Sequence, residues 1–220
     1  MSEKTYSPAD IWTVREEPAT AKFREHARIA EALRQLTASF IRVDADTATL
    51  ARHADVLEAM AKEVAAQPHI SHLALFDRLR TGTATREDCE HIFDFEIMVG
   101  RAAAVAPPMQ LWVDGEVVHA RATLNHVFQG PPGRVHGGVI ALMMDILLAR
   151  VQEITGTLGF TGYLNIRYHA ATPLDTELTM DARILNREGR KMLVEGRIFA
   201  NGVHTVTAEG LWITAATNMF

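Results

Sequence analysis

The stretch GPPGRVHGGVIALMMD, residues 130–145, joins a rigid bend to the start of a strongly apolar segment. Two glycines flank two prolines in residues 130–133, and these residue types are typical of tight turns. The apolar segment then runs over residues 135–154 and contains no proline. Because it is apolar nearly all round, it predicts a helix that is buried on all sides.

The start and the middle of this predicted helix carry residues suited to chemistry. His136, Gly137 and Gly138 lie at its N-terminus, where backbone N–H groups lack partners within the helix and where the helix dipole favours negative charge. Such N–H groups can stabilise a developing oxyanion. Asp145 lies among apolar neighbours, where a carboxylate is costly to bury without partners. Asp145 is therefore either held by structural hydrogen bonds or positioned for catalysis, and the residues alone leave both open.

Strand patterns lie on both sides of this helix. Before it, LWVDGEVVHARATL has two extended runs around Asp114-Gly115, which is a strong hairpin signal. After it, residues 161–170 alternate, with Leu164, Ile166 and Tyr168 on one face.

The C-terminal residues 177–215 predict three long strands, with turns at Asn186–Gly189 and at Asn201-Gly202. The order of elements is therefore a hairpin, one buried helix and a meander of antiparallel strands. The expected fold class is α+β, in which a long antiparallel sheet wraps around a single central helix.

Helical periodicity dominates the first third of the chain. Apolar residues spaced by three and four predict two amphipathic helices, at about 18–41 and 47–66, with Asp46 as the N-cap of the second. The short connection favours an antiparallel pair, which needs to pack on the main domain or on another subunit. Residues 67–93 show no sustained period and predict a connector with one or two short helical turns.

These patterns divide the chain into two parts. Residues 1–93 form the helical extension and connector, and residues 94–220 form the main domain. Nothing in the extension predicts a nucleic-acid-binding helix, because acidic and basic residues are mixed along it.

Composition limits the classes of function. The formal net charge of −5 provides no global basic field for nucleic acid, and Cys89 as a single cysteine allows no intramolecular disulfide. We see no signal peptide and no apolar run of the roughly 20 residues that cross a bilayer. The expectation is a cytoplasmic protein without membrane or nucleic-acid partners.

The pattern P-G-x-x-H-G-G-x(6)-D, from Pro132 to Asp145, resembles the hotdog-fold acyl-CoA thioesterases of the phenylacetate-pathway (PaaI-like) and 4-hydroxybenzoyl-CoA thioesterase superfamily. The resemblance extends over about 99–215 and includes GRAAAVAPPM and LNIRYHAATPL. It implies a hotdog domain that hydrolyses an acyl-CoA thioester to a free acid and CoA. It also implies a reaction without a metal or another cofactor.

The resemblance implies a role for each motif residue. Asp145 matches the carboxylate that activates water or attacks the thioester, and the N–H of Gly137 or Gly138 matches the oxyanion donor. His136 matches the motif histidine, which is expected to shape and hydrogen-bond this turn, with a role as general base as the alternative. Thr161 matches a position where relatives often have Ser or Thr near the nucleophilic water, although an ordinary strand-start threonine is an equal alternative.

The family also places its active sites at the interface of a homodimer, sometimes within a tetramer. The carboxylate then comes from one subunit and the oxyanion amide from the other. Candidate residues for acyl-CoA binding, as opposed to plain core or surface roles, are Met143, Met144 and Leu147 for the acyl chain and Arg134 and Arg167 for the phosphates.

One position departs from some relatives, which carry Asn or Gln where this chain has Gly130. Two other functions also stay open. The first alternative is a hotdog protein that binds acyl-CoA without catalysis, as a sensor or scaffold. A hydratase ranks lower, because no histidine follows Asp145 within the helix.

Overall fold

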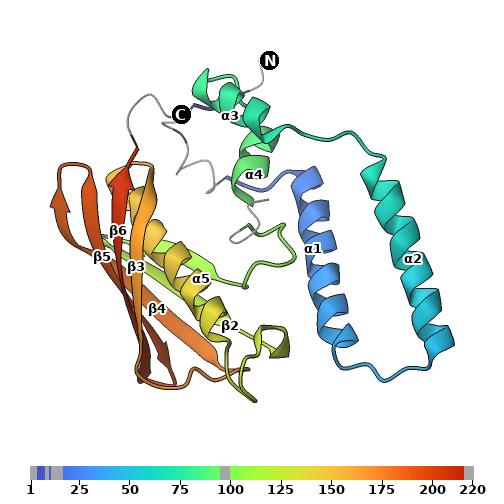
Figure 1. Ribbon diagram of the computed structural model, residues 1–220. Coiled ribbons are helices and arrows are strands. Elements are labelled where there is room, and N and C mark those ends of the chain that lie inside the picture. Colours follow the sequence, from blue (N-terminus) through green and yellow to red (C-terminus); the bar gives the residue numbers. More distant parts are fainter. Residues whose placement is uncertain (1–3, 8–9, 11–16, 95–99, 216–220) are drawn as a thin grey trace.

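The computed structural model describes residues 4–7, 10, 17–94 and 100–215, and its largest part is an antiparallel sheet that curves around one helix (Figure 1). The helix is α5 (Gly137–Ala149). The strands are β1 (Gln110–Asp114), β2 (Val117–Thr123), β3 (Gly159–Tyr168), β4 (Glu177–Glu188), β5 (Lys191–Ala200) and β6 (Val203–Thr214). Their order across the sheet is β1-β2-β4-β5-β6-β3. The expected hotdog architecture is confirmed.

The main core lies between α5 and the inner face of the sheet. Alternate residues of β5 are buried, as expected for a strand with one face on a core. At Gly196 a Cβ atom would lie only 2.7 Å from Leu148 Cδ1 and 3.0 Å from Met144 Cε. Glycine at this position therefore lets α5 pack directly against the middle of the sheet.

The apolar segment predicted as one helix over residues 135–154 is divided in the structure. α5 ends at Ala149, and the short helix α6 (Gln152–Thr155) follows it. Polar residues enter the segment at this point, and Arg150 Nε lies 2.7 Å from Glu153 Oε2 in an ion pair. The prediction of a single helix to residue 154 was therefore too long.

The predicted turns are mostly where the sequence indicates them. Asn201 and Gly202 both have positive φ, 49° and 77°, as the tight hairpin turn between β5 and β6 requires. The turn predicted at Asn186–Gly189 was wrong by a few residues, because β4 continues to Glu188. The register of β4 and β5 shifts between Ile184 and Asn186, and this bulge extends the pairing before the chain turns.

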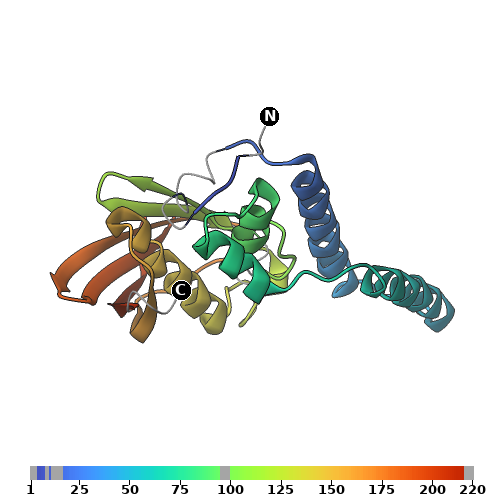
Figure 2. The ribbon, with the colours of Figure 1, turned by 90° about the horizontal axis from the view of Figure 1, so that it is seen from above.

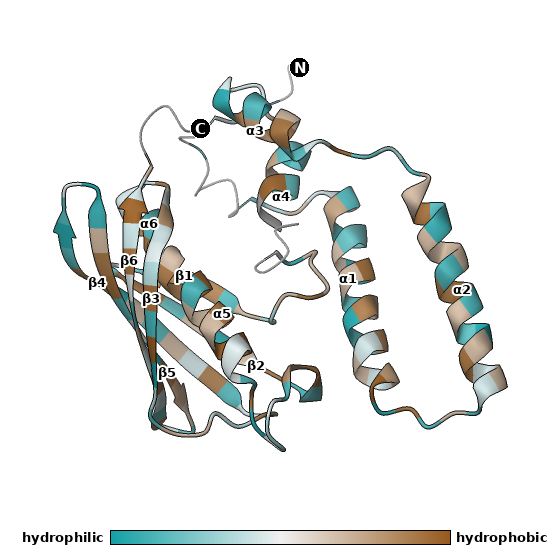
Figure 3. Cartoon of the chain, viewed as in Figure 1, coloured by the Kyte–Doolittle hydropathy of each residue, from teal (hydrophilic) through white to brown (hydrophobic). Residues whose placement is uncertain are grey.

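Two long helices form an arm beside the hotdog domain (Figures 1 and 2). α1 (Ala21–Phe40) and α2 (Thr47–Ala65) match the predicted helices within a few residues. Asp46 caps α2 as predicted, since its side chain accepts a hydrogen bond from the Thr49 N–H at 2.9 Å. All of α2 is described, and none of its residues is buried, although apolar side chains recur along it (Figure 3).

The connector contains more structure than the sequence analysis predicted. α3 (His72–Arg80) and α4 (Arg86–Asp94) each span nine residues instead of a turn or two. Leu75 and Leu79 of α3 share a small second core with Cys89 of α4. Burial in this core raises the pKa of the Cys89 thiol to about 11. The predicted boundary between residues 93 and 94 lies beside residues 95–99, which are outside the described part of the chain.

Among the described helices, none combines the length and the apolar character that crossing a lipid bilayer requires.

Candidate active site

The N-terminus of α5 has the geometry that the sequence suggested. His136 is the N-cap residue, and its Nδ1 accepts a hydrogen bond from the Gly138 N–H at 3.0 Å. A Cβ at Gly138 would lie 3.2 Å from this Nδ1, so a glycine there allows the imidazole ring to fold back over the helix end. The Gly138 N–H is thus already engaged by His136.

The preceding amide is available. Within the described residues, the Gly137 N–H donates to no acceptor, whereas the amides of Val139 and Ile140 both donate to the His136 carbonyl. Gly137 is the first residue of α5, where an N–H points out of the helix along its dipole. Of the two glycine amides named from the sequence, Gly137 is therefore the one free to bind an oxyanion.

The bend before α5 explains the departure at Gly130. A Cβ at Gly130 would lie 2.9 Å from His136 Cα and 3.3 Å from its Cβ and Cδ2. The Gly130 N–H donates to the Arg134 carbonyl at 2.9 Å, and the His136 N–H donates to the Phe128 carbonyl at 2.8 Å. Only glycine fits this close approach, so the loop that supports His136 excludes an Asn or Gln at residue 130.

Asp145 meets Thr161 two turns further along α5. Thr161 Oγ1 donates to Asp145 Oδ1 at 3.0 Å, and the Asp145 side chain is half-buried within the single chain. The two residues, named separately from the sequence, therefore form one polar pair. One carboxylate oxygen is held by this bond, and the other oxygen is left for water or substrate.

A bulge in β3 aims Thr161 at the helix. The register of β3 and β6 shifts between Thr161 and Tyr163, so that Gly162 is an extra residue in the strand. Side chains two residues apart in a regular strand point to the same face, but the extra residue turns Thr161 away from the face of Tyr163. Without the bulge, Thr161 would point away from Asp145.

Sequence analysis missed the role of Tyr168 at the other end of β3. Its hydroxyl donates to the Gly137 carbonyl at 2.9 Å. Sequence patterning placed Tyr168 only on one face of its strand, together with Leu164 and Ile166, and no local signal pairs it with a residue 31 positions earlier. β3 therefore contacts α5 at two points of the site, through Thr161 and through Tyr168.

The two chemical features of α5 lie far apart along one helix. Asp145 lies eight positions after Gly137, which corresponds to about 12 Å along the axis at about 1.5 Å per residue. A catalytic carboxylate and an oxyanion donor each need to approach the reacting group to about 3 Å. The Gly137 amide and the Asp145 carboxylate of one chain are therefore too far apart to approach the same small reacting group.

The surface around the site is open on one side. β3 is an edge strand, and Phe160 and Tyr168 are each 51% exposed. On α5, Gly138 is exposed and Leu142 and Asp145 are half-buried, so one face of the helix is incompletely covered. An edge strand with exposed aromatic side chains is a surface on which another strand can pair.

The binding residues named from the sequence fall into two groups. Met143, Met144 and Leu147 have no exposed surface and belong to the core between α5 and the sheet. Arg134 and Arg167 are exposed, Arg134 in the loop before His136 and Arg167 beside Tyr168 on β3. It stays a prediction that the three buried residues line a channel for the acyl chain. Because they have no exposed surface, the core around them would have to open for the acyl chain to reach them.

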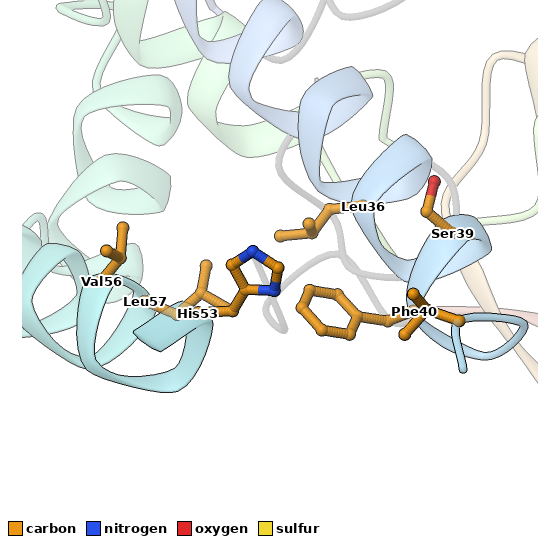
Figure 4. A pocket seen from close by; sticks show the side chains of 7 residues that line it. Leu36, Ser39, Phe40, His53, Val56 and Leu57 are labelled. Atoms are coloured by element: carbon orange, nitrogen blue, oxygen red, sulfur yellow. The ribbon is translucent and has the colours of Figure 1, made fainter. Parts of the chain in front are cut away.

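A separate groove of about 290 Å³ lies between α1 and α2, away from this site (Figure 4). Its lining is largely apolar and includes Leu36, Phe40, Val56 and Leu57, with Ser39 and His53 as its polar members. The rings of Phe40 and His53 meet edge to face at 5.9 Å. None of the residues predicted for the active site lines this groove.

Several known proteins resemble this chain over part of its length. Residues 132–207 match the family model of the thioesterase superfamily. The human acyl-coenzyme A thioesterase THEM5 is 33% identical over 81 residues, which are 37% of this chain and 33% of THEM5. The acyl-coenzyme A thioesterase THEM4 of Bos taurus is 33% identical over 87 residues, which are 39% of this chain and 35% of THEM4. The chain thus matches about a third of the length of these curated relatives.

One solved structure resembles nearly the whole chain. The crystal structure of protein RHA08564, a thioesterase superfamily protein, is 29% identical, with a TM-score of 0.72. The match covers 89% of this chain and 96% of that chain, which is more than the hotdog domain alone could provide. The likeness therefore includes much of the helical N-terminal part. The hotdog domain of this chain therefore resembles the thioesterase superfamily, whose family model matches residues 132–207.

Proposed function

We propose that the protein hydrolyses an acyl-CoA thioester to a free acid and CoA, at a site built from α5 and β3. The observation that carries this proposal is the 3.0 Å hydrogen bond from Thr161 Oγ1 to Asp145 Oδ1. It orients a half-buried carboxylate on the helix whose N-terminus presents the free Gly137 amide. The resemblance to acyl-coenzyme A thioesterases supports the same activity.

In the proposed reaction, the Asp145 carboxylate accepts a proton from water while the water oxygen bonds to the thioester carbonyl carbon. The carbonyl oxygen becomes an oxyanion and accepts a hydrogen bond from the Gly137 N–H. Collapse of this intermediate re-forms the carbonyl and breaks the carbon–sulfur bond. The CoA thiolate leaves and takes up the proton that Asp145 accepted. Direct attack by the carboxylate would instead form a mixed anhydride as the carbon–sulfur bond breaks and the CoA thiolate leaves, and water would then hydrolyse the anhydride.

The site is proposed to form between two copies of the chain. The separation of about 12 Å between Gly137 and Asp145 along one α5 supports a site shared between two copies. Two copies related by a two-fold axis, with their α5 helices antiparallel, would bring Asp145 of one copy towards Gly137 of the other. The exposed edge of β3 supports such a homodimer, since pairing there would join the two sheets. Two dimers could further associate into a tetramer.

The positions of the remaining candidate binding residues suggest where the CoA phosphates and the acyl group lie. The exposed Arg134 and Arg167 are proposed to contact CoA phosphates, because Arg matches phosphate geometry and charge. The acyl group is proposed to lie near the incompletely covered face of α5, with Met143, Met144 and Leu147 behind it. A substrate of the phenylacetate or 4-hydroxybenzoate type would place an aromatic ring there.

The test is thiol release from a panel of aromatic and aliphatic acyl-CoAs. Asp145→Asn keeps the shape of the side chain but removes its ability to accept the proton, and we expect turnover to fall by roughly 10²–10⁴-fold. Asp114→Asn is the matched control, because it makes the same chemical change on the exposed β1–β2 hairpin.

Each result of this experiment has a definite meaning. Turnover that survives Asp145→Asn would move the catalytic role to another residue. Saturable binding of acyl-CoA without thiol release by the native protein would favour the non-catalytic sensor or scaffold. Equal losses in both variants would indicate a general effect of the substitutions on the fold.

A further inference from the structure

The peptide group between Gly137 and Gly138 is held from both sides. Its carbonyl oxygen, on Gly137, accepts a hydrogen bond from the Tyr168 hydroxyl at 2.9 Å. Its N–H, on Gly138, donates to His136 Nδ1 at 3.0 Å. This peptide is adjacent to the one whose N–H, on Gly137, is proposed to bind the oxyanion, so its orientation directly affects where that N–H points.

Tyr168, the Gly137–Gly138 peptide and His136 form a chain of hydrogen bonds in which each group donates to the next. Tyr168 donates to the peptide carbonyl, and the same peptide donates to the imidazole of His136. Bonds arranged in this way polarise one another, so that loss of the first weakens the second. Because Nδ1 of His136 is an acceptor, the proton of the neutral ring lies on Nε2.

The position of Tyr168 supports an effect confined to this peptide. A Cβ built on Gly137 would lie 3.6 Å from the Tyr168 hydroxyl oxygen and 3.8 Å from Cζ, so the phenol covers the first residue of α5 in ordinary contact. The Tyr168 side chain is half-exposed and belongs to the edge strand. Removal of its hydroxyl therefore leaves the main core unchanged.

We propose that Tyr168 is a positioning residue. Its hydroxyl fixes the Gly137–Gly138 peptide, which holds His136 as the Nε2–H tautomer and keeps the Gly137 amide directed at the oxyanion. The consequence for the reaction rate rests on the proposed thioesterase function. The consequence for the state of His136 does not depend on that function.

The decisive variant is Tyr168→Phe, which removes one oxygen atom and keeps the ring. Tyr163→Phe is the matched control on the same strand, because Tyr163 donates to Glu209 at 3.0 Å on the opposite face of the sheet. For each protein, kcat and KM would be measured with the best acyl-CoA substrate. The ring nitrogens of His136 and the amide of Gly138 would be observed by 15N NMR.

We expect kcat of Tyr168→Phe to fall by about tenfold or more while KM changes little, because an oxyanion donor acts mainly in the transition state. In the native protein, His136 should show a single neutral tautomer with an unprotonated Nδ1. In Tyr168→Phe the Gly138 amide signal should shift, and His136 should become a mixture of tautomers. Tyr163→Phe should match the native protein in kcat, in KM, in the His136 tautomer and in the Gly138 amide signal.

Other outcomes would overturn the proposal. A native tautomer and native Gly138 signal in Tyr168→Phe would show that the hydroxyl does not act through the peptide, even if kcat falls. Native kinetics in that variant would show that any change of the peptide has no catalytic effect. If the native protein hydrolyses no thioester, the proposed function fails, and the NMR comparison alone still decides whether Tyr168 controls His136.

Discussion

Helices α5 and α2 are both rich in apolar residues, but their surroundings are opposite. α5 buries six of its thirteen residues against the sheet, whereas α2 buries none of its nineteen. α5 also carries both halves of the proposed site, and its polar contacts to β3 are made by Thr161 and Tyr168. Apolar character alone therefore does not locate the core, since the sheet that encloses α5 has no counterpart around α2.

The largest expected effect on stability is at the centre of the buried helix. Leu148→Ala removes a side chain with no exposed surface that packs against β5 and β6 at Gly196 and Gly210. Such a cavity costs about 2–5 kcal/mol in the free energy of unfolding. Chemical denaturation would measure the loss, and a change below about 1 kcal/mol, well under that range, would contradict the assignment of this face to the core.

The free amide at the start of α5 gives the next largest effect. Gly137→Pro removes that N–H and adds a pyrrolidine ring, which is well tolerated at the first residue of a helix. His136 already has the extended backbone, φ −63° and ψ 134°, that a following proline prefers. We expect turnover to fall by roughly 10²–10³-fold, as for other oxyanion donors. Circular dichroism should show a native fold, and native turnover would exclude the Gly137 amide from the reaction.

The bond between Thr161 and Asp145 is expected to matter less. Thr161→Val keeps the shape of a β-branched strand residue and removes the hydroxyl that orients the carboxylate. Turnover should fall by about ten- to a hundredfold, since one hydrogen bond to a charged group contributes about 1.5–3 kcal/mol. Steady-state kinetics beside Thr179→Val, the same change on β4, would separate this effect from a general loss of strand stability. Equal rates in the two variants would count against the pair.

The smallest effect is expected on α2. Val56 is 61% exposed, and Val56→Ala should change the free energy of unfolding by no more than about 0.5 kcal/mol. The same denaturation experiment as for Leu148→Ala would make the comparison direct. A loss of about 2 kcal/mol or more, as for a buried side chain, would show that α2 is covered in the assembled protein.

Several features could be predicted from sequence because their signals are local. The bend before His136, the turn at Asn201-Gly202 and the N-cap at Asp46 each depend on residues within a few positions. Periodicity likewise located α1 and α2. Family resemblance named Thr161 and Asp145 separately, and the hydrogen bond of 3.0 Å between Thr161 Oγ1 and Asp145 Oδ1 appears only in the structure.

Other features depend on contacts between distant segments, which a single sequence does not encode locally. The bulge at Gly162 follows from the register of two strands, and Tyr168 reaches Gly137 only once β3 lies beside α5. Comparison with relatives made Gly130 look like a missing polar residue, and only its close packing against His136 shows why a glycine is needed there. α3 was missed although Ser71 caps it and Leu75 and Leu79 lie four apart, because so short a pattern is weak alone.

The most direct test of the shared site is complementation between two inactive variants. Asp145→Asn lacks the carboxylate, and Gly137→Pro lacks the amide, so each should be inactive alone. A mixed dimer contains one site with both native groups. The two variants would be coexpressed with different affinity tags. If they assemble at random, half of the dimers are mixed and each mixed dimer has one native site of two, so the unseparated dimers should recover about a quarter of native thiol release. Absence of recovery in isolated mixed dimers would contradict a site that takes Asp145 from one copy and Gly137 from the other.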